Sequence, residues 1–340
     1  YIVTGLKELS ACRVGDTVAL VSSDAKSLPG YREVRPMVFA GLFPNEGSTV
    51  EELREGMAKL RLSDASLTME PERSSALGVG FRCGLLGMLH LEIVQERLKR
   101  EAGVEVIVTT PSVAYRILKN GGGEEIIKSP IDLPDQSRIE NILEPWVKLD
   151  IVVPQEHIGA VMALAQGRRG VYKTTEYLDK TRVLLHYEMP LSQVIVDFHD
   201  ALKSATSGYG SLSYELTDER QADVVRMDIL VAEEPVEAFS TLVYKEEEHE
   251  AGKLIVEVLK DEIQRQQFVV KLQAAVGGKI VASERISALR KDVTAGLYGG
   301  DATREQKLLE KQKKGKKKMM ARGHGSVDIP STAYVKVLKR

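Results

Sequence analysis

The order of strand-like and helix-like segments occurs twice along this chain of 340 residues, and this repetition restricts the fold more than any other feature. From Val34 to Thr110 the order is strand, helix, strand, strand, helix, strand, with VEELREGMAKL and LLGMLHLEIVQERLKRE as the helical stretches. The same order returns from Glu144 to Asp228, although the residues differ. Such a β-α-β-β-α-β unit buries its apolar faces by packing two helices on one antiparallel sheet. We therefore predict an α+β chain with two ferredoxin-like sandwich domains.

Apolar spacing indicates which side of the predicted helices faces a core. The second helix of the first unit has apolar residues at helical spacing, typical of a core-facing stripe. These residues are Met88, Leu91, Val94 and Leu98. A later helix is expected from about His249 to Ile263, with its own buried set. That set is Leu254, Ile255, Val258 and Leu259.

The remaining segments differ from the two repeated units. Residues 111–143 contain Gly121, Gly122 and Gly123 followed by two prolines, which predicts a hairpin plus a linker. After Val231, KLQAAVGGKIVASERI predicts two short strands across a Gly-Gly turn, and VDIPSTAYVKVLK is expected to close the chain as a strand. The opening residues 1–33 read as strands of a domain whose first half is missing.

Positive charge is concentrated between Thr303 and His324. This stretch contains nine Lys or Arg residues against Glu305 and Glu310, in a chain whose net charge is −2. Such concentration favours a polyanionic partner. Four of its lysines fall at i, i+4, i+7 and i+11, which makes one cationic row on a helix that can follow a phosphate backbone. These are Lys307, Lys311, Lys314 and Lys318. A solvated helix and an anionic membrane surface are the alternatives.

Catalytic and metal-binding patterns are scarce. A phosphate loop requires Gly-Lys followed by Ser or Thr, and no Gly-Lys pair of the chain has that continuation. Cys12 and Cys83 are far apart, and the histidines form no pair at ligand spacing. We therefore expect no cofactor, no metal and no catalytic residue in this chain.

Two glycine-bearing turns of the second repeated unit are better candidates. The first contains Arg168 and Arg169, and the second runs from Ser204 to Gly210. Each turn follows a predicted helix, and both are expected at one edge of the domain. Guanidinium groups, hydroxyls and an aromatic ring suit contacts to phosphates and unstacked bases. The alternative is that the glycines only cap the helices.

Several stretches resemble a known family. ERSSALGVGFRCGLLGMLHLEIVQERLKRE resembles the third domain of ribosomal translocation GTPases. QGRRGV, LKSATSGYGSLSYEL, RQQFVVKLQAAVGGKIVA, LRKDVTAGLYGGDATREQKLLEKQKKGKKKMM and VDIP look like the elongation factor 4 (LepA) family. This resemblance covers essentially the whole chain. The chain departs from the family at Ser207, where a basic residue is usual, and at Gln264, where proline is usual.

The resemblance implies a division of the chain into five parts. Residues 1–33 would be the end of β-barrel domain II, 34–110 domain III, 111–143 a hairpin and linker, and 144–230 domain V. Residues 231–340 would be the family's own α+β C-terminal domain, which binds tRNA or other RNA through a basic helix. The GTP-binding domain, with its GTP and Mg, would be missing from the chain.

The family's function follows as an implication of the resemblance. It implies a monomeric translation fidelity GTPase that moves tRNAs back by one codon or aids fidelity under stress. Its partners would be tRNA and the factor-binding region of the ribosome, with 23S and 16S rRNA. It would lie in the cytoplasm, with peripheral membrane association, although an organellar homologue also fits. The expected RNA-binding residues are Arg168, Arg169, Lys203, Ser207, Tyr209, Arg290, Lys291, Lys307, Lys311, Lys314, Lys316, Lys317 and Lys318.

Two further classes of function stay open from sequence. One is a stand-alone RNA-binding module or a translocation-factor relative without GTPase activity. The other is a small-molecule enzyme on the same sandwich fold, such as an acyl-phosphate hydrolase, because a fold alone does not fix a function. A phosphate loop encoded upstream of Tyr1 would favour the GTPase, and a convergent polar pocket would favour the enzyme.

Overall fold

The structure is a computed structural model that describes residues 5, 16–23, 26, 28, 36–45, 47–74, 77–289, 302–321, 327 and 329–338. Most of the segment expected to end a β-barrel domain lies outside these residues. The chain forms two compact units by its internal contacts. The first consists of Tyr1–Ala114 and Pro145–Asp218, and the second of Tyr115–Glu144 and Glu219–Arg340.

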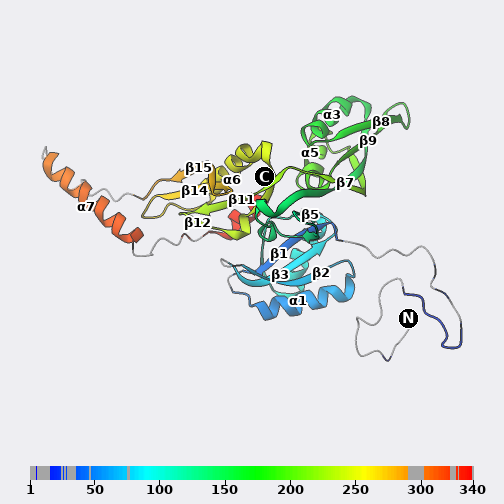
Figure 1. The fold of residues 1–340 in the computed structure, drawn as a ribbon, viewed down its shortest axis with the longest axis horizontal. Helices are drawn as coiled ribbons and strands as arrows, with labels where there is room; N and C mark the ends of the chain where they lie inside the picture. Colours follow the sequence, from blue (N-terminus) through cyan, green and yellow to red (C-terminus); the bar gives the residue numbers. More distant parts are fainter. Residues whose placement is uncertain are drawn as a thin grey trace. The chain divides into compact units, whose positions relative to one another are not determined.

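The first unit contains the first predicted β-α-β-β-α-β order (Figure 1). Its four strands pair in the order β2-β3-β1-β4, and every pairing between them is antiparallel. Of the predicted stripe, Leu91, Val94 and Leu98 are buried and Met88 is half-buried, so the core-facing side was predicted correctly. The elements are β1 (Val38–Pro44), α1 (Val50–Ser63), β2 (Thr68–Ser74), β3 (Gly78–Leu85), α2 (Met88–Arg97) with a π-helical end at Leu98–Ala102, and β4 (Val106–Val108).

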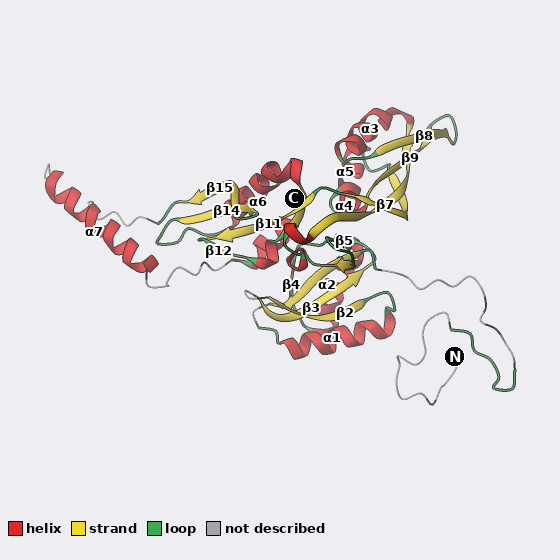
Figure 2. Cartoon of the chain, in the orientation of Figure 1, coloured by secondary structure: helices red, strands yellow, loops and turns green. Residues whose placement is uncertain are grey.

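The second predicted order is also present (Figure 2). Strand β7 pairs with β9, β9 pairs with β8, and β10 pairs with β7. Alternate residues of β7, namely Val147, Leu149, Ile151 and Val153, are fully buried, as a strand with one core face requires. The elements are β7 (Ile139–Pro154), α3 (Ile158–Gly167), β8 (Val171–Tyr177), β9 (Arg182–Pro190), α4 (Leu191–Ile195), α5 (Phe198–Ala205) and β10 (Ser211–Gln221).

The second unit combines a hairpin with a five-stranded sheet. Strands β5 and β6 pair antiparallel on either side of the three glycines, where a hairpin was predicted. The five-stranded sheet has the order β12-β11-β14-β15, with β13 paired to β11. The elements are β5 (Tyr115–Lys119), β6 (Glu124–Ile127), β11 (Val224–Val231), β12 (Glu234–Pro235), β13 (Thr241–Tyr244), α6 (Glu248–Glu262), β14 (Val270–Val276), β15 (Lys279–Ile286), α7 (Ala302–Ala321) and α8 (Ser331–Leu338).

Helix α6 shows a correction to the predicted buried face. Ile255 and Leu259 are buried as expected, but Leu254 is 45% exposed, and Val256 is buried instead. The buried stripe includes Gly252, where an added Cβ would lie 2.9 Å from the Cβ of Ala274. Gly252, Ile255, Val256 and Leu259 follow the i, i+3, i+4, i+7 spacing of one helical face, and Leu254 and the half-buried Val258 lie off that face.

The end of the chain is a second correction, because α8 is a helix where a strand was expected. Ala333, Tyr334 and Val337 are buried, which is the spacing of a helical face and not the alternation of a strand. The Tyr334 ring stacks on Phe239 at a centroid distance of 4.7 Å. Packing against the C-terminal sheet domain therefore decides the conformation of a segment whose β-branched residues favour a strand.

Candidate nucleic-acid interface

The paired-arginine turn ends helix α3 in a defined capped geometry. The Gly170 N–H donates to the Ala165 carbonyl at 2.8 Å, and the Arg169 N–H donates to the Gln166 carbonyl at 3.3 Å. This is a Schellman pattern, in which the residue after the cap adopts the left-handed conformation. Arg169 occupies that position with φ of 59°. Gly170 is required beside it, because a Cβ there would lie 2.6 Å from the Ala165 carbonyl oxygen.

The second turn repeats this geometry after α5. The Gly208 N–H donates to the Lys203 carbonyl at 2.7 Å, and Ser207 takes the left-handed position with φ of 50°. The buried Thr206 hydroxyl donates to the Leu202 carbonyl at 2.7 Å and accepts from the Gly210 N–H at 2.8 Å. The loop is therefore fixed from inside by Thr206, a residue that sequence reasoning did not single out.

The outer side of the second turn carries the candidate contacts. Tyr209 is 73% exposed, and Ser207 is exposed beside it. The half-buried Lys203 ammonium donates to the Gly208 carbonyl at 3.2 Å, so this lysine already has a partner in the turn. An aromatic ring held on a rigid loop is suited to stacking on an unpaired base.

The two turns do not lie at one edge of their domain, which corrects the expectation. The Arg168 Nη1 donates weakly, at 3.5 Å, to the carbonyl of Val196, which precedes the N-terminal end of α5. The second turn follows the opposite end of that helix. With eight residues, α5 separates the turns by roughly 12 Å. The physical reason is that the two helices of such a unit run antiparallel, so their C-terminal ends point in opposite directions.

Helix α7 carries the predicted row of lysines. Lys307, Lys311 and Lys314 are exposed. Leu309 is 45% exposed, whereas Leu308 beside it is half-buried. The helix continues through Gly315 to Ala321. One glycine costs a helix only about 1 kcal/mol, which the surrounding good helix formers offset.

Some predicted residues cannot be placed. Arg290 and Lys291 lie outside the described residues, and the side chains of Lys316, Lys317 and Lys318 are likewise not described.

Within the described ranges, no group of three or more His, Cys, Asp or Glu side chains could hold a metal ion. No helix in those ranges is long and apolar enough to cross a membrane.

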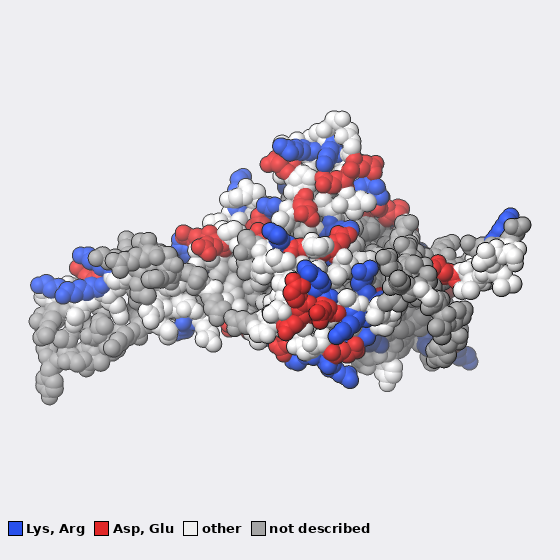
Figure 3. Space-filling model, turned by 90° about the horizontal axis from the view of Figure 1, so that it is seen from below, with Lys and Arg blue, Asp and Glu red and all other residues white. Residues whose placement is uncertain are grey.

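The charge distribution distinguishes α7 from the rest of the visible surface. On the face shown in Figure 3, basic and acidic side chains are interspersed over most of the described residues. Among the side chains of α7 that the structure describes, four lysines, Lys307, Lys311, Lys313 and Lys314, stand against Glu310. A helix with such a local excess of cations is suited to phosphate contacts.

Comparisons with known proteins agree with the resemblance noted in the sequence. Residues 231–339 match the family model described as GTP-binding protein LepA C-terminus, and residues 141–230 match elongation factor G C-terminus. The chain is 51% identical over 340 residues to elongation factor 4 of Alkaliphilus oremlandii and of Lacticaseibacillus casei. It is 51% identical over 339 residues to elongation factor 4 of Lactococcus lactis.

These relatives are longer than the chain. The matches cover 99–100% of this chain but only 55–56% of each relative, so the chain spans about half the length of the curated proteins it matches. Both family models describe C-terminal segments. Over its entire length, the chain is therefore similar to the C-terminal part of elongation factor 4 proteins.

Proposed function

We propose that this chain is the ribosome- and tRNA-binding C-terminal part of a translation factor of the elongation factor 4 type. The observation that carries the proposal is the identity of about one half to proteins of that name over the entire chain. The exposed lysine row of α7 and the two capped turns supply surfaces that suit RNA. In the full-length protein, GTP and Mg would bind the part that this chain does not cover.

The proposed division into domains follows the strand orders. The orders β2-β3-β1-β4 and β8-β9-β7-β10 support two ferredoxin-like units, which would be domain III at residues 34–110 and domain V at 144–230. Residues 231–340 would be the RNA-binding C-terminal domain. Residues 1–33 and 111–143 would be the end of domain II and a connecting hairpin.

The proposed contacts have distinct physical roles. The lysines of α7 would neutralise backbone phosphates of tRNA, which binds without reading sequence. The turns of domain V would contact ribosomal RNA through Arg168, Arg169 and Tyr209. Arg169 and Ser207 hold left-handed conformations that usually favour glycine, at a cost of about 1 kcal/mol each. A side chain retained at such a cost supports a role in binding. In the complete factor, these contacts would support movement of tRNAs back by one codon.

A ribosome-binding measurement tests the role of the paired-arginine turn. We expect the Arg168→Ala, Arg169→Ala double variant to bind ribosomes more weakly, with a salt slope smaller by roughly 1.4 to 1.8 if both residues contact phosphates. Both side chains are half-buried, and Arg168 donates a long bond, at 3.5 Å, to the Val196 carbonyl, so the thermal stability should change by no more than about 1 kcal/mol. The Arg61→Ala, Arg100→Ala variant removes the same charge from exposed positions and is the control. Unchanged binding with a large loss of stability would assign the arginines to capping alone.

The chain without the rest of the protein should neither bind nor hydrolyse GTP. Phosphoryl transfer requires a phosphate cradle and a positioned metal ion, and the sequence contains no phosphate loop. Equilibrium dialysis of the chain against labelled GTP, with a full-length relative as positive control, measures this directly. Stoichiometric binding by the chain would contradict the prediction.

A further inference from the structure

The turn between β5 and β6 contains the one Asn-Gly pair of the chain, at Asn120 and Gly121. Both residues are exposed, and Gly121, Gly122 and Gly123 have positive φ angles of 89°, 91° and 110°. Because three consecutive glycines carry no Cβ, the backbone of this turn is adaptable and its amide groups are not shielded by side chains. The side chain of Asn120 can therefore meet the main chain of the residue that follows it.

The main-chain nitrogen of Gly121 is available as a nucleophile. Hydrogen bonds close the turn around it, since the Gly122 N–H donates to the Lys119 carbonyl at 3.1 Å and the Lys119 N–H donates to the Gly123 carbonyl at 3.0 Å. The Gly121 N–H itself donates to no residue that the structure describes. Since no hydrogen bond holds this nitrogen and no side chain covers it, it can approach the Asn120 carboxamide.

The Asn120 carboxamide is held by a segment on the other side of the hairpin. Its Nδ2 donates to the Ser137 carbonyl at 2.8 Å, and the Asn120 N–H donates to the Arg138 carbonyl at 2.9 Å. A carbonyl oxygen only accepts, so this contact requires the NH2 group of a carboxamide and excludes a carboxylate. Asn120 thus joins the hairpin to the residues before β7, and any reaction of its carboxamide competes with the bond to Ser137.

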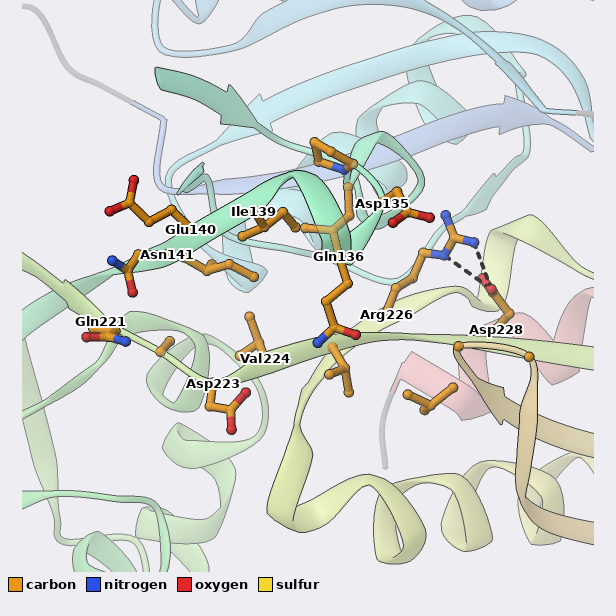
Figure 4. A pocket seen from close by; sticks show the side chains of 18 residues that line it. Asp135, Gln136, Ile139, Glu140, Asn141, Gln221, Asp223, Val224, Arg226 and Asp228 are labelled. Atoms are coloured by element: carbon orange, nitrogen blue, oxygen red, sulfur yellow. Dashed lines mark hydrogen bonds and ion pairs between the residues drawn. The ribbon is translucent and has the colours of Figure 1, made fainter. Parts of the chain in front are cut away.

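A second turn fixes the carbonyl that holds Asn120. Asp135 Oδ1 accepts from the Ser137 hydroxyl at 2.6 Å and from the Ser137 N–H at 2.9 Å. These hydrogen bonds hold the pKa of Asp135 below its usual range, so the acceptor is anionic at neutral pH. Asp135 and Gln136 lie next to Ile139, where β7 begins (Figure 4). The Asp135 turn therefore keeps the Ser137 carbonyl in place opposite the hairpin.

We propose that Asn120 is a site of spontaneous deamidation, and that the turn of Asp135 and Ser137 slows the reaction by holding the Asn120 carboxamide. The Gly121 nitrogen loses its proton to hydroxide and attacks Cγ of Asn120. A C–N bond forms, and the carboxamide nitrogen takes a proton from water and leaves as ammonia. Water then opens the cyclic imide at either carbonyl, which leaves aspartate or isoaspartate. The steps consume only water and involve no oxidation or reduction.

The product no longer fits the contact with Ser137. A carboxylate oxygen would face the Ser137 carbonyl oxygen, and two acceptors without a shared proton repel each other. Isoaspartate also adds a methylene group to the main chain, which displaces the bond between Gly122 and Lys119. Deamidation therefore releases the hairpin from the residues before β7. The site is independent of the proposed RNA contacts, because it shares no residue with the domain V turns or α7.

Peptide mapping by mass spectrometry tests the proposal on the complete folded chain, incubated at mildly alkaline pH. The chain has three asparagines, so Asn45 and Asn141 are internal controls. Both are half-buried, and Glu and Ile follow them in place of glycine. We expect Asn120 to be converted first, with part of the product labelled by an isoaspartyl methyltransferase. Conversion of Asn120 no faster than that of Asn45 or Asn141 would overturn the proposal.

Variants of Asp135 test the restraint on the reaction. Asp135→Ala removes both bonds to Ser137, so Asn120 should be converted roughly two- to tenfold faster. Asp135→Asn keeps an acceptor oxygen without the charge and should react at nearly the parent's rate. The control is Asp179→Ala, which removes a similar turn in the other unit, where Asp179 Oδ1 accepts from the Thr181 N–H and hydroxyl, both at 2.8 Å. Parent-like conversion in Asp135→Ala, or equal acceleration by Asp135→Asn or by the control, contradicts the restraint.

Limited digestion with trypsin measures the release of the hairpin. Arg138 is exposed, and its carbonyl accepts from Asn120. Cleavage after Arg138 should be roughly two- to tenfold faster in the Asn120→Asp variant, because the hydrogen bond to Ser137 is lost. Gln136→Glu adds the same charge to the neighbouring turn without changing Asn120, and it is the control. Parent-like cleavage of Asn120→Asp, or equal acceleration by Gln136→Glu, would show that the carboxamide does not join the two segments.

Discussion

Replacing Lys307, Lys311, Lys314 and Lys318 together by alanine is expected to weaken tRNA binding and to reduce its salt dependence. Each lost phosphate contact lowers the magnitude of the salt slope by roughly 0.7 to 0.9, so four contacts lower it by roughly 2.8 to 3.6. Between about 50 and 200 mM salt, the parent's affinity should therefore fall roughly 50 to 150 times further than the variant's. Fluorescence titration of labelled tRNA over a salt series measures both quantities.

The control for this prediction removes four other exposed lysines. Lys59, Lys148, Lys180 and Lys253 are all exposed and lie outside α7. Their combined replacement by alanine lowers the net charge equally, so it reports any effect of charge alone. If the α7 variant and the control have the same affinity and slope as the parent, α7 is a solvated helix and does not contact tRNA.

The repeated architecture could be predicted from sequence because its signals are local. Each helix of the two units shows apolar residues at helical spacing, and the structure buries Leu91, Val94 and Leu98 as expected. Thr49 and Glu52 form a capping box at the start of α1, a local sequence pattern that also fixes that boundary. Elements with such internal signals need no tertiary information to be recognised.

Features that depend on contacts between distant segments could not be predicted in this way. The close approach of Gly252 in α6 to Ala274 in β14 depends on both segments, so the helix sequence alone does not show it. The separation of the Arg168 and Tyr209 turns is different, because the antiparallel course of α3 and α5 already follows from the predicted β-α-β-β-α-β order.

The last helix shows the same limit most clearly. Val335 and Val337 gave the terminal segment the composition of a strand, yet α8 forms because Ala333, Tyr334 and Val337 fit one buried face together. The conformation is therefore set by the docking surface that Phe239 and α6 provide. Tertiary packing overrides local preference at this position, and a mutation in that contact tests the explanation.

Replacing Tyr334 by alanine is expected to destabilise the second unit strongly. Truncating a buried aromatic residue costs about 3 to 5 kcal/mol, because it loses apolar contact and leaves a cavity. For a unit of this size, about 3 kcal/mol lowers the melting temperature by roughly 6 to 12 °C, which calorimetry can resolve. The stacked Phe239 ring would lose its partner, so the loss should appear in the transition of the unit that contains β11 and α6.

Lys336 provides the matched comparison that distinguishes a helix from a strand. In α8 the side chain of Lys336 is 62% exposed and pairs with Glu262, whose side chain is 13% exposed, so Lys336→Ala should lower the melting temperature less than Tyr334→Ala does. In a strand, Tyr334 and Lys336 would lie on the same face, and a buried face would make both replacements costly. A large effect at Tyr334 with a small one at Lys336 is therefore the result that a docked helix requires. Equally large losses of melting temperature at the two positions would contradict a helix and would indicate a strand.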